Sequence, residues 1–229
     1  MEKKILSFDE AKQNIEMNEE ADDINDMILA LIDAAFDESC ISDEMSPEEM
    51  YKLASNAYAD EFKRKNICHI LAYMKKSAKS GYIPAMLFLG EYYNSTKDSV
   101  EPDYHESFKW YKMAADKGVE EGEYKTAKLY ENGKGVKRDL KTAFELYKRA
   151  ADKERAEAIN ALGRFYMHGI VVERDEDKAY SLFKKSVDMG CVDALYNLSV
   201  CYVEGIGVDA DFLKARTLKT KADKLKHQK

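Results

Sequence analysis

The stretch from Gly122 to Glu154 reads GEYKTAKLYENGKGVKRDLKTAFELYKRAADKE. Moved forward by 36 residues, it falls on a second, similar copy of itself. The positions that recur at this spacing are a loop glycine, an aspartate and a tyrosine: Gly133, Gly169 and Gly205; Asp139, Asp175 and Asp211; Tyr130, Tyr166 and Tyr202. A fixed period of this length, with two amphipathic segments in each unit, is typical of a helical solenoid. We therefore predict an all-α fold of stacked helix pairs.

The period divides the chain into three parts. We predict an acidic helical extension or cap at 1–45, a repeat solenoid at 46–213, and a basic capping helix and tail at 214–229. Units are expected at about 46–82, 83–118, 119–154 and 155–190, with the first helix of the last unit at 191–213. The first unit is degenerate, and it starts at the helix-capping sequence Ser46-Pro47-Glu48-Glu49.

Each clear unit carries its own helix signals. Just past the first helix stands a glycine, which suits a left-handed C-terminal residue: Gly133, Gly169 and Gly205. Just before the second helix stands an aspartate, which suits an N-cap: Asp103, Asp139, Asp175 and Asp211. Within the first helix stands a small residue, which allows a neighbouring helix to approach: Gly90, Ala127, Gly163 and Ser199.

Polar residues in the second helix of the last unit predict where the array ends. Arg216, Lys219 and Asp223 occupy positions that are aromatic or apolar in the earlier units. Burying these three charges without partners would be costly. We therefore expect no further helix beyond this one.

Charge is polarised along the chain. Residues 1–50 hold 16 acidic and 3 basic side chains, whereas 214–229 hold seven basic side chains and one acidic. An acidic helix is predicted over 22–36, with an apolar stripe made by Ile24, Met27, Ile28, Leu31, Ile32, Ala35 and Phe36. This stripe either caps the first repeat or docks into a partner.

The repeated residues resemble the Sel-1-like repeat, a relative of the tetratricopeptide repeat. The resemblance rests on Ala158, Leu162-Gly163, Tyr166, Gly133-Lys134-Gly135-Val136, Asp175, Lys178-Ala179, Phe183 and Ala150-Ala151. It covers about 83–225, is weaker over 46–82 and is absent before that. It implies a right-handed α/α superhelical solenoid that holds proteins or peptides, as adaptors in signalling, in protein quality control or in bacterial interactions with a host.

The cysteines and the chain ends bear on the compartment. Some secreted relatives pair cysteines within each repeat, whereas Cys40, Cys68, Cys191 and Cys201 do not show that spacing. They are interpreted as buried or half-buried free thiols. No secretory leader and no apolar run of membrane-spanning length occurs. These features favour the cytoplasm.

The motifs that would indicate other chemistry are incomplete. Gly133-Lys134-Gly135 lacks the spacing and the strand of a phosphate loop. The histidines show no metal-ligand spacing, and Asp209-Ala210-Asp211 is followed by Lys214 where a calcium loop needs glycine. The lysine-rich tail lacks the aromatic residues of a nucleic-acid site, and we interpret it as a solvated cap rather than a membrane anchor. We predict no enzyme activity and no cofactor.

The predicted binding residues lie on the first helices, on the concave face by analogy with tetratricopeptide grooves. They are Tyr124, Lys128, Asn160, Arg164, Tyr196 and Asn197. Lys128 and Arg164 are 36 residues apart and would grip a carboxylate or an acidic or C-terminal peptide; the alternative is two solvated charges. We therefore predict a non-enzymatic protein-interaction scaffold, monomeric or weakly associated head to tail. Two alternatives stay open: a dedicated inhibitor or immunity-type partner of one enzyme or toxin, and a self-associating structural protein.

Overall fold

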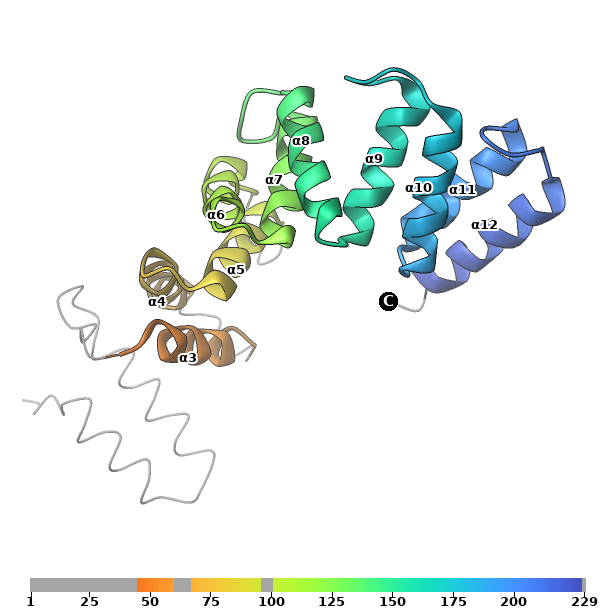
Figure 1. Ribbon diagram of the computed structural model, residues 1–229. Coiled ribbons are helices and arrows are strands. Elements are labelled where there is room, and N and C mark those ends of the chain that lie inside the picture. The colour runs from red at the N-terminus through yellow and green to blue at the C-terminus, as the bar shows by residue number, and fades with distance from the viewer. Residues whose placement is uncertain (1–44, 60–66, 96–100, 228–229) are drawn as a thin grey trace, which may run out of the picture. The chain divides into compact units, whose positions relative to one another are not determined.

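The computed structural model describes residues 45–59, 67–95 and 101–227, and within these ranges its regular structure is entirely α-helical (Figure 1). The helices are α3 (Pro47–Ala59), α4 (Ile67–Lys79), α5 (Ile83–Asn94), α6 (Tyr104–Asp116), α7 (Glu120–Asn132), α8 (Leu140–Asp152), α9 (Ala156–His168), α10 (Glu176–Asp188), α11 (Val192–Glu204) and α12 (Phe212–Lys226). Residues 1–44 of the acidic extension predicted at 1–45, which include Cys40, lie outside the described residues. The predicted all-α solenoid is confirmed.

The chain divides into two compact units, Met1–Leu89 and Gly90–Lys229. In the first unit, α3 packs against α4. The Ser46 hydroxyl accepts a hydrogen bond from the Glu49 backbone N–H at 3.2 Å, and the Glu49 carboxylate accepts one from the Ser46 N–H at 2.9 Å. This reciprocal pair is the predicted capping box, and it fixes the start of α3.

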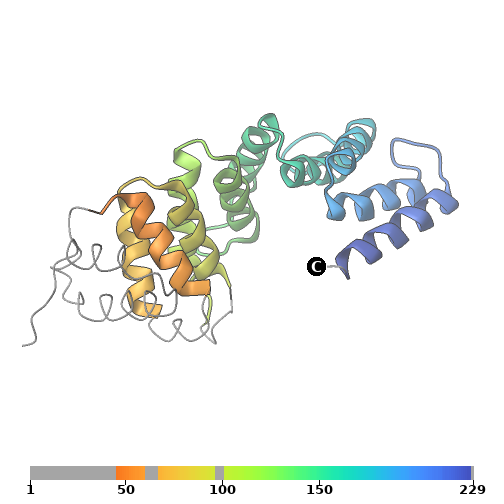
Figure 2. The ribbon, with the colours of Figure 1, turned by 90° about the horizontal axis from the view of Figure 1, so that it is seen from below.

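In the second unit, successive helices form antiparallel pairs: α7 with α8, α9 with α10, and α11 with α12 (Figure 1, Figure 2). The pairs stack through contacts of α8 with α9 and of α10 with α11. The first helices α9 and α11 also contact each other directly. Equivalent positions on first helices are therefore brought side by side, one period apart.

The predicted helix signals are confirmed in the second unit. Each predicted aspartate accepts a hydrogen bond from a backbone N–H in the first turn of the helix that follows: Asp103, Asp139, Asp175 and Asp211. Each predicted glycine ends a first helix in the left-handed region: Gly133 (φ 67°), Gly169 (φ 64°) and Gly205 (φ 72°). Since L residues are disfavoured in this region, these glycines set where the chain leaves the first helix.

Small residues in the first helices allow aromatic rings to pack closely. A Cβ atom added to Gly163 would lie 2.6 Å from the Phe183 ring, and one added to Gly90 would lie 2.6 Å from the Tyr111 ring. Both rings are almost fully buried. The close helix approach that the sequence predicts at these positions is therefore present.

The recurring tyrosines have equivalent surroundings. Tyr130, Tyr166 and Tyr202 each meet an aromatic ring of a second helix at a steep angle, and these rings recur with the same period: Phe108 at 5.2 Å, Phe144 at 6.1 Å and Tyr180 at 5.9 Å between ring centroids. The edge-to-face geometry is a favourable one for aromatic pairs. The repeat register in the sequence is thus the register of the packing.

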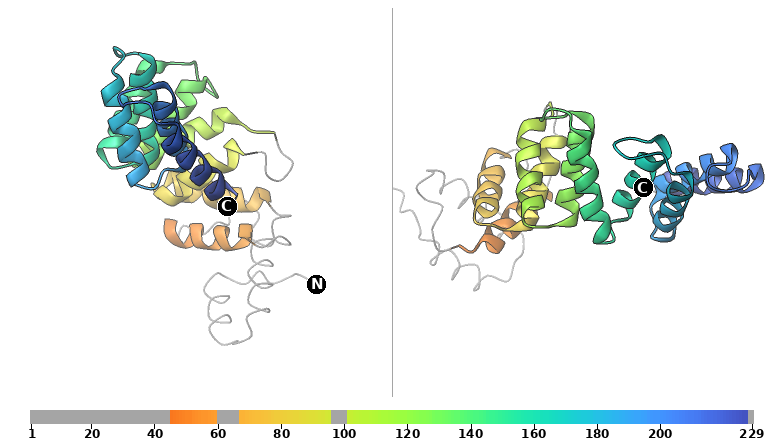
Figure 3. Two further views of the ribbon diagram at one scale, coloured as in Figure 1. Left: turned by 90° about the vertical axis from the view of Figure 1, so that its right-hand side faces the viewer. Right: turned by 45° about the horizontal axis from the view of Figure 1, so that its top comes forward.

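Helix α12 ends the described row of helices. It buries Ala215 and Ala222, whereas Arg216, Lys219 and Asp223 are exposed. In the left panel of Figure 3, α12 is the helix nearest to the viewer, and no other described helix covers its outer side. The polar residues Arg216, Lys219 and Asp223 therefore lie on a helix whose outer side no described helix covers.

Candidate functional site

One groove on the second unit is lined by all six of the predicted binding residues. They are Tyr124 and Lys128 on α7, Asn160 and Arg164 on α9, and Tyr196 and Asn197 on α11. The groove has a volume of about 480 Å³. Residues far apart in the sequence meet here because the period places them on the same side of neighbouring first helices.

The two predicted cations differ in their surroundings. Lys128 is exposed and has no ion pair with any described residue. Arg164, by contrast, donates to Glu131, with Nη2 2.9 Å from Oε1 and 3.1 Å from Oε2. Of the two, Lys128 is therefore the cation available to a ligand carboxylate, and Arg164 is already neutralised.

A buried tyrosine holds the carboxylate that neutralises Arg164. The Tyr147 hydroxyl donates to Glu131 Oε2 at 2.6 Å. Burial, followed by the adjacent Glu131 carboxylate, raises the pKa of Tyr147. The hydroxyl therefore remains protonated and keeps donating to Glu131 near neutral pH.

Two asparagines form a polar pair in the middle of the groove. Asn197 Nδ2 donates to Asn160 Oδ1 at 2.7 Å, across α11 and α9. In the described part of the chain, nothing accepts from the Asn160 amide group or donates to the Asn197 oxygen. One donor and one acceptor thus remain side by side, which is the pattern that a peptide backbone can satisfy.

Helix α12 borders the groove near Tyr196. The Tyr196 hydroxyl donates to the Asp223 carboxylate, and Lys226 Nζ lies 4.3 Å from the centroid of the Tyr196 ring. Lys226 Nζ also lies 3.2 Å from Asp193 Oδ1. These contacts hold the last turn of α12 against α11, with Lys226 in the groove wall.

The charged residues that line the groove balance one another. The cations are Lys128, Arg164 and Lys226, and the acids are Glu131, Glu157 and Asp193. Sequence reasoning selected cations and amides on the first helices and missed the acids. Glu157 and Asp193 are themselves one period apart, so the repeat carried a signal for this acidic row.

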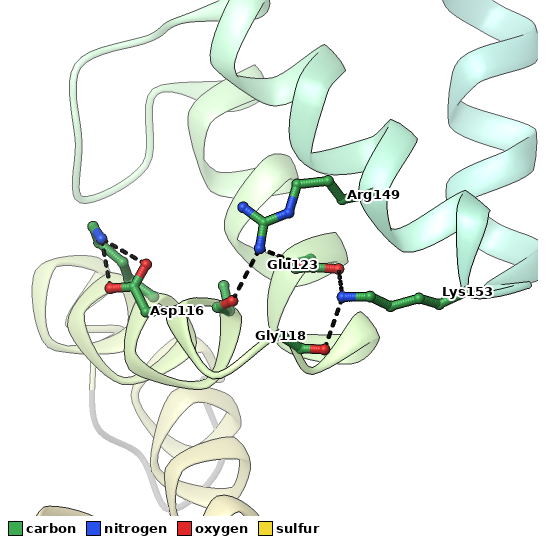
Figure 4. Close-up of polar contacts among 7 residues, drawn as sticks. Asp116, Gly118, Glu123, Arg149 and Lys153 are labelled. Atoms are coloured by element: carbon green, nitrogen blue, oxygen red, sulfur yellow. Dashed lines mark hydrogen bonds and ion pairs between the residues drawn. The ribbon is translucent and has the colours of Figure 1, made fainter.

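A fully buried carboxylate lies outside the groove, between α7 and α8 (Figure 4). Glu123 Oε2 is 2.7 Å from Lys153 Nζ, which also donates to the carbonyl of Gly118 at 2.8 Å. Glu123 Oε1 is 2.5 Å from Arg149 Nη2, a close ion pair without the alignment of a hydrogen bond. Since protein groups on all sides enclose this carboxylate, we interpret it as a structural link between the helices.

The described residues hold no cluster of three His, Cys, Asp or Glu side chains arranged for a metal ion. None of the described helices is long and apolar enough to cross a membrane.

The described cysteines are free thiols in two environments: Cys191 and Cys201 are buried, and Cys68 is exposed rather than half-buried as the sequence suggested. Burial raises the pKa of Cys201 to about 11. Because the thiolate is the reactive form, Cys201 is expected to react with iodoacetamide at pH 8 at least about 100-fold more slowly than Cys68. Peptide mapping of the native protein by mass spectrometry measures both rates. Equal rates would show that the helices around Cys201 open readily.

Comparison with known proteins gives a consistent result. No protein of curated function matches the sequence. The structure of c5321, a protective antigen of uropathogenic Escherichia coli with an SLR fold, is similar at 25% identity and a TM-score of 0.68. The match covers 96% of this chain and 49% of c5321, so this chain spans about half the length of that protein. A Sel1 repeat protein from Oxalobacter formigenes is similar at 25% identity and a TM-score of 0.66, covering 87% of this chain and 84% of that one.

The family itself is identified from the repeats. The family model described as Sel1 repeat matches four consecutive segments, 83–119, 120–154, 156–191 and 192–222. These segments make up more than half of the chain and contain α7, α9 and α11, which carry the predicted binding residues. The chain therefore belongs to the Sel1 repeat family, whose repeats generally mediate protein–protein interaction.

Proposed function

We propose that this chain is a non-catalytic adaptor whose groove on α7, α9 and α11 binds an extended segment of a protein partner. The observation that carries the proposal is the convergence of six polar side chains from three equivalent helices in one groove. The groove offers hydrogen-bonding groups and one unpaired cation, and we find no nucleophile beside a base in it.

The charges of the groove define the segment further. Because its six charged residues balance, a uniformly acidic peptide would meet as much repulsion as attraction. Lys128 fits a single carboxylate, from an acidic side chain or from a chain end. The free groups of Asn160 and Asn197 fit the main chain beside it. We therefore propose a segment with one carboxylate rather than an acidic run.

Lys128→Glu is expected to weaken partner binding about 10- to 100-fold, because it removes a charge-assisted hydrogen bond and adds repulsion. Lys128 is the better test position, since a glutamate at Arg164 would face Glu131 and disturb the fold. Partners captured by the tagged full-length chain are identified by mass spectrometry. Tiled peptides from each are then titrated by fluorescence anisotropy.

Lys148→Glu is the matched control, because Lys148 is also exposed, also has no ion pair among the described residues and does not line the groove. It should bind the same peptide as the unchanged protein does. Asn197→Ala should weaken binding about tenfold without changing the charge. If Lys128→Glu and Asn197→Ala both leave affinity and thermal midpoint unchanged, the partner binds elsewhere and the proposal fails.

A further inference from the structure

The outer face of α12 is an exposed basic surface. One side of the helix carries Leu213, Arg216, Thr217, Thr220, Lys221 and Lys224, which line a shallow hollow. None of its three cations has an ion pair with a described residue. Leu213 is 77% exposed, and Phe212 next to it, at the start of the helix, is 70% exposed. The surface, which we call the α12 face, thus combines unpaired positive charge with uncovered apolar area.

On α8, two positions are covered by the first helix of the following unit. Phe144 and Tyr147 on α8 are buried and pack against Phe165 of α9. At the same positions α12 has Arg216 and Lys219, and both are exposed. Arg216, at the edge of the α12 face, therefore lies where α9 docks on α8, whereas the positions equivalent to the rest of the face are exposed on α8. The positive charge of the α12 face favours an acidic segment over an apolar one.

The same chain contains a segment of the complementary kind. Residues 1–44 hold 14 acidic and 3 basic side chains, whereas 212–229 hold seven basic and one acidic. Asp22, Asp26, Asp33 and Asp37 are spaced by four, seven and four residues, which is the spacing of one helical face. On the predicted 22–36 helix, this acidic face is opposite the apolar stripe, so the stripe can be buried while the acids stay available.

We propose that the α12 face binds the acidic segment around residues 22–37 of a second copy of this chain. The contact joins two different surfaces, so each added copy leaves one acidic segment and one α12 face free. Assembly should therefore grow with concentration rather than stop at a dimer. This inference does not depend on the peptide groove, since the side chains of the α12 face do not line it.

Sedimentation velocity of the full-length chain tests the proposal. The monomer mass is 26.2 kDa. At about 50 mM salt, the weight-average mass should at least double between about 5 and 200 μM protein, and at about 0.5 M salt it should return to the monomer because the charges are screened. An α12-face variant, with Arg216→Glu, Lys221→Glu and Lys224→Glu, should stay monomeric. The same three reversals at Lys137, Lys141 and Lys148 are the matched control and should assemble like the unchanged chain.

Mixing two variants identifies the surfaces that meet. A second variant, with Asp22→Asn, Asp26→Asn and Asp33→Asn, keeps the α12 face and should also be monomeric by itself. An equimolar mixture of the two should form a dimer and nothing larger, because it has a single working contact. A mixture that stays monomeric, or an unchanged chain that is monomeric at low salt, overturns the proposal. Binding of that monomer to phosphatidylserine vesicles would then assign the α12 face to an anionic membrane.

Discussion

Removing the two cations that face Glu123, with Arg149→Ala and Lys153→Ala in one variant, is expected to lower the free energy of unfolding by about 3 to 5 kcal/mol. The Glu123 carboxylate is fully buried, and both of its ion-pair partners come from α8. Without them, a negative charge remains in the interior with no opposite charge near it. Urea denaturation followed by circular dichroism measures the loss.

Removing the buried carboxylate instead of its two cations should change the free energy of unfolding little, and this variant is the control. In the next two repeats, the position of Glu123 is occupied by Ile159 and Leu195, both buried. Arg149 and Lys153 are 53% and 39% exposed, so they stay hydrated when the carboxylate is removed. Glu123→Leu is therefore expected to change the free energy of unfolding by less than about 1 kcal/mol.

A triple variant shows whether the loss of stability comes from the unpaired Glu123 charge or from the lost packing of the α8 side chains. Adding Glu123→Leu to the double alanine variant should restore most of the stability, because no buried charge is left without a partner. If the triple variant is as unstable as the double one, the loss comes from the packing of the α8 side chains instead. Because Glu123 contacts Arg149 and Lys153, the effects of these substitutions do not add, and all variants should be compared in one mutant cycle.

Much of this architecture follows from single residues whose role is local. Asp139 caps α8 by contacts within its own first turn, and Gly133 ends α7 by its own backbone angle. Such roles can be recognised without knowing the rest of the fold. The period then determines stacking, because Gly163 meets a ring in its own helix pair and Gly90, in an earlier pair, does the same.

The candidate site was predictable in its location but less so in its charge. The register placed Lys128 and Arg164 on adjacent helices, and the structure agrees. The pairing of Arg164 with Glu131 was not predictable from the period, because position 131 has no recurring residue type. Lys226 reaches the groove from the last helix, which departs from the repeat. Properties that recur can be predicted from the repeat, whereas contacts made by one unit alone require coordinates.

Gly135→Val is expected to lower the free energy of unfolding by about 3 kcal/mol or more, because two penalties add. Gly135 has φ +68°, where a β-branched residue is strained. A Cβ atom there would also lie 1.9 Å from the backbone oxygen of Tyr104, which cannot rotate away as a side chain could. The start of α6 would have to separate from the loop, and the urea midpoint reports the change.

The reverse substitution one period later should stabilise the protein. Val171 occupies the position of Gly135 and has φ +67°, so it bears the backbone strain of the left-handed region. Its side chain is 45% exposed, so Val171→Gly removes little packing. Relief of the strain exceeds the added chain entropy of glycine in the unfolded state, for a net gain of about 0.5 to 1 kcal/mol. A loss of stability would mean that the Val171 side chain contributes more packing than its 45% exposure suggests, and that this packing outweighs the backbone strain.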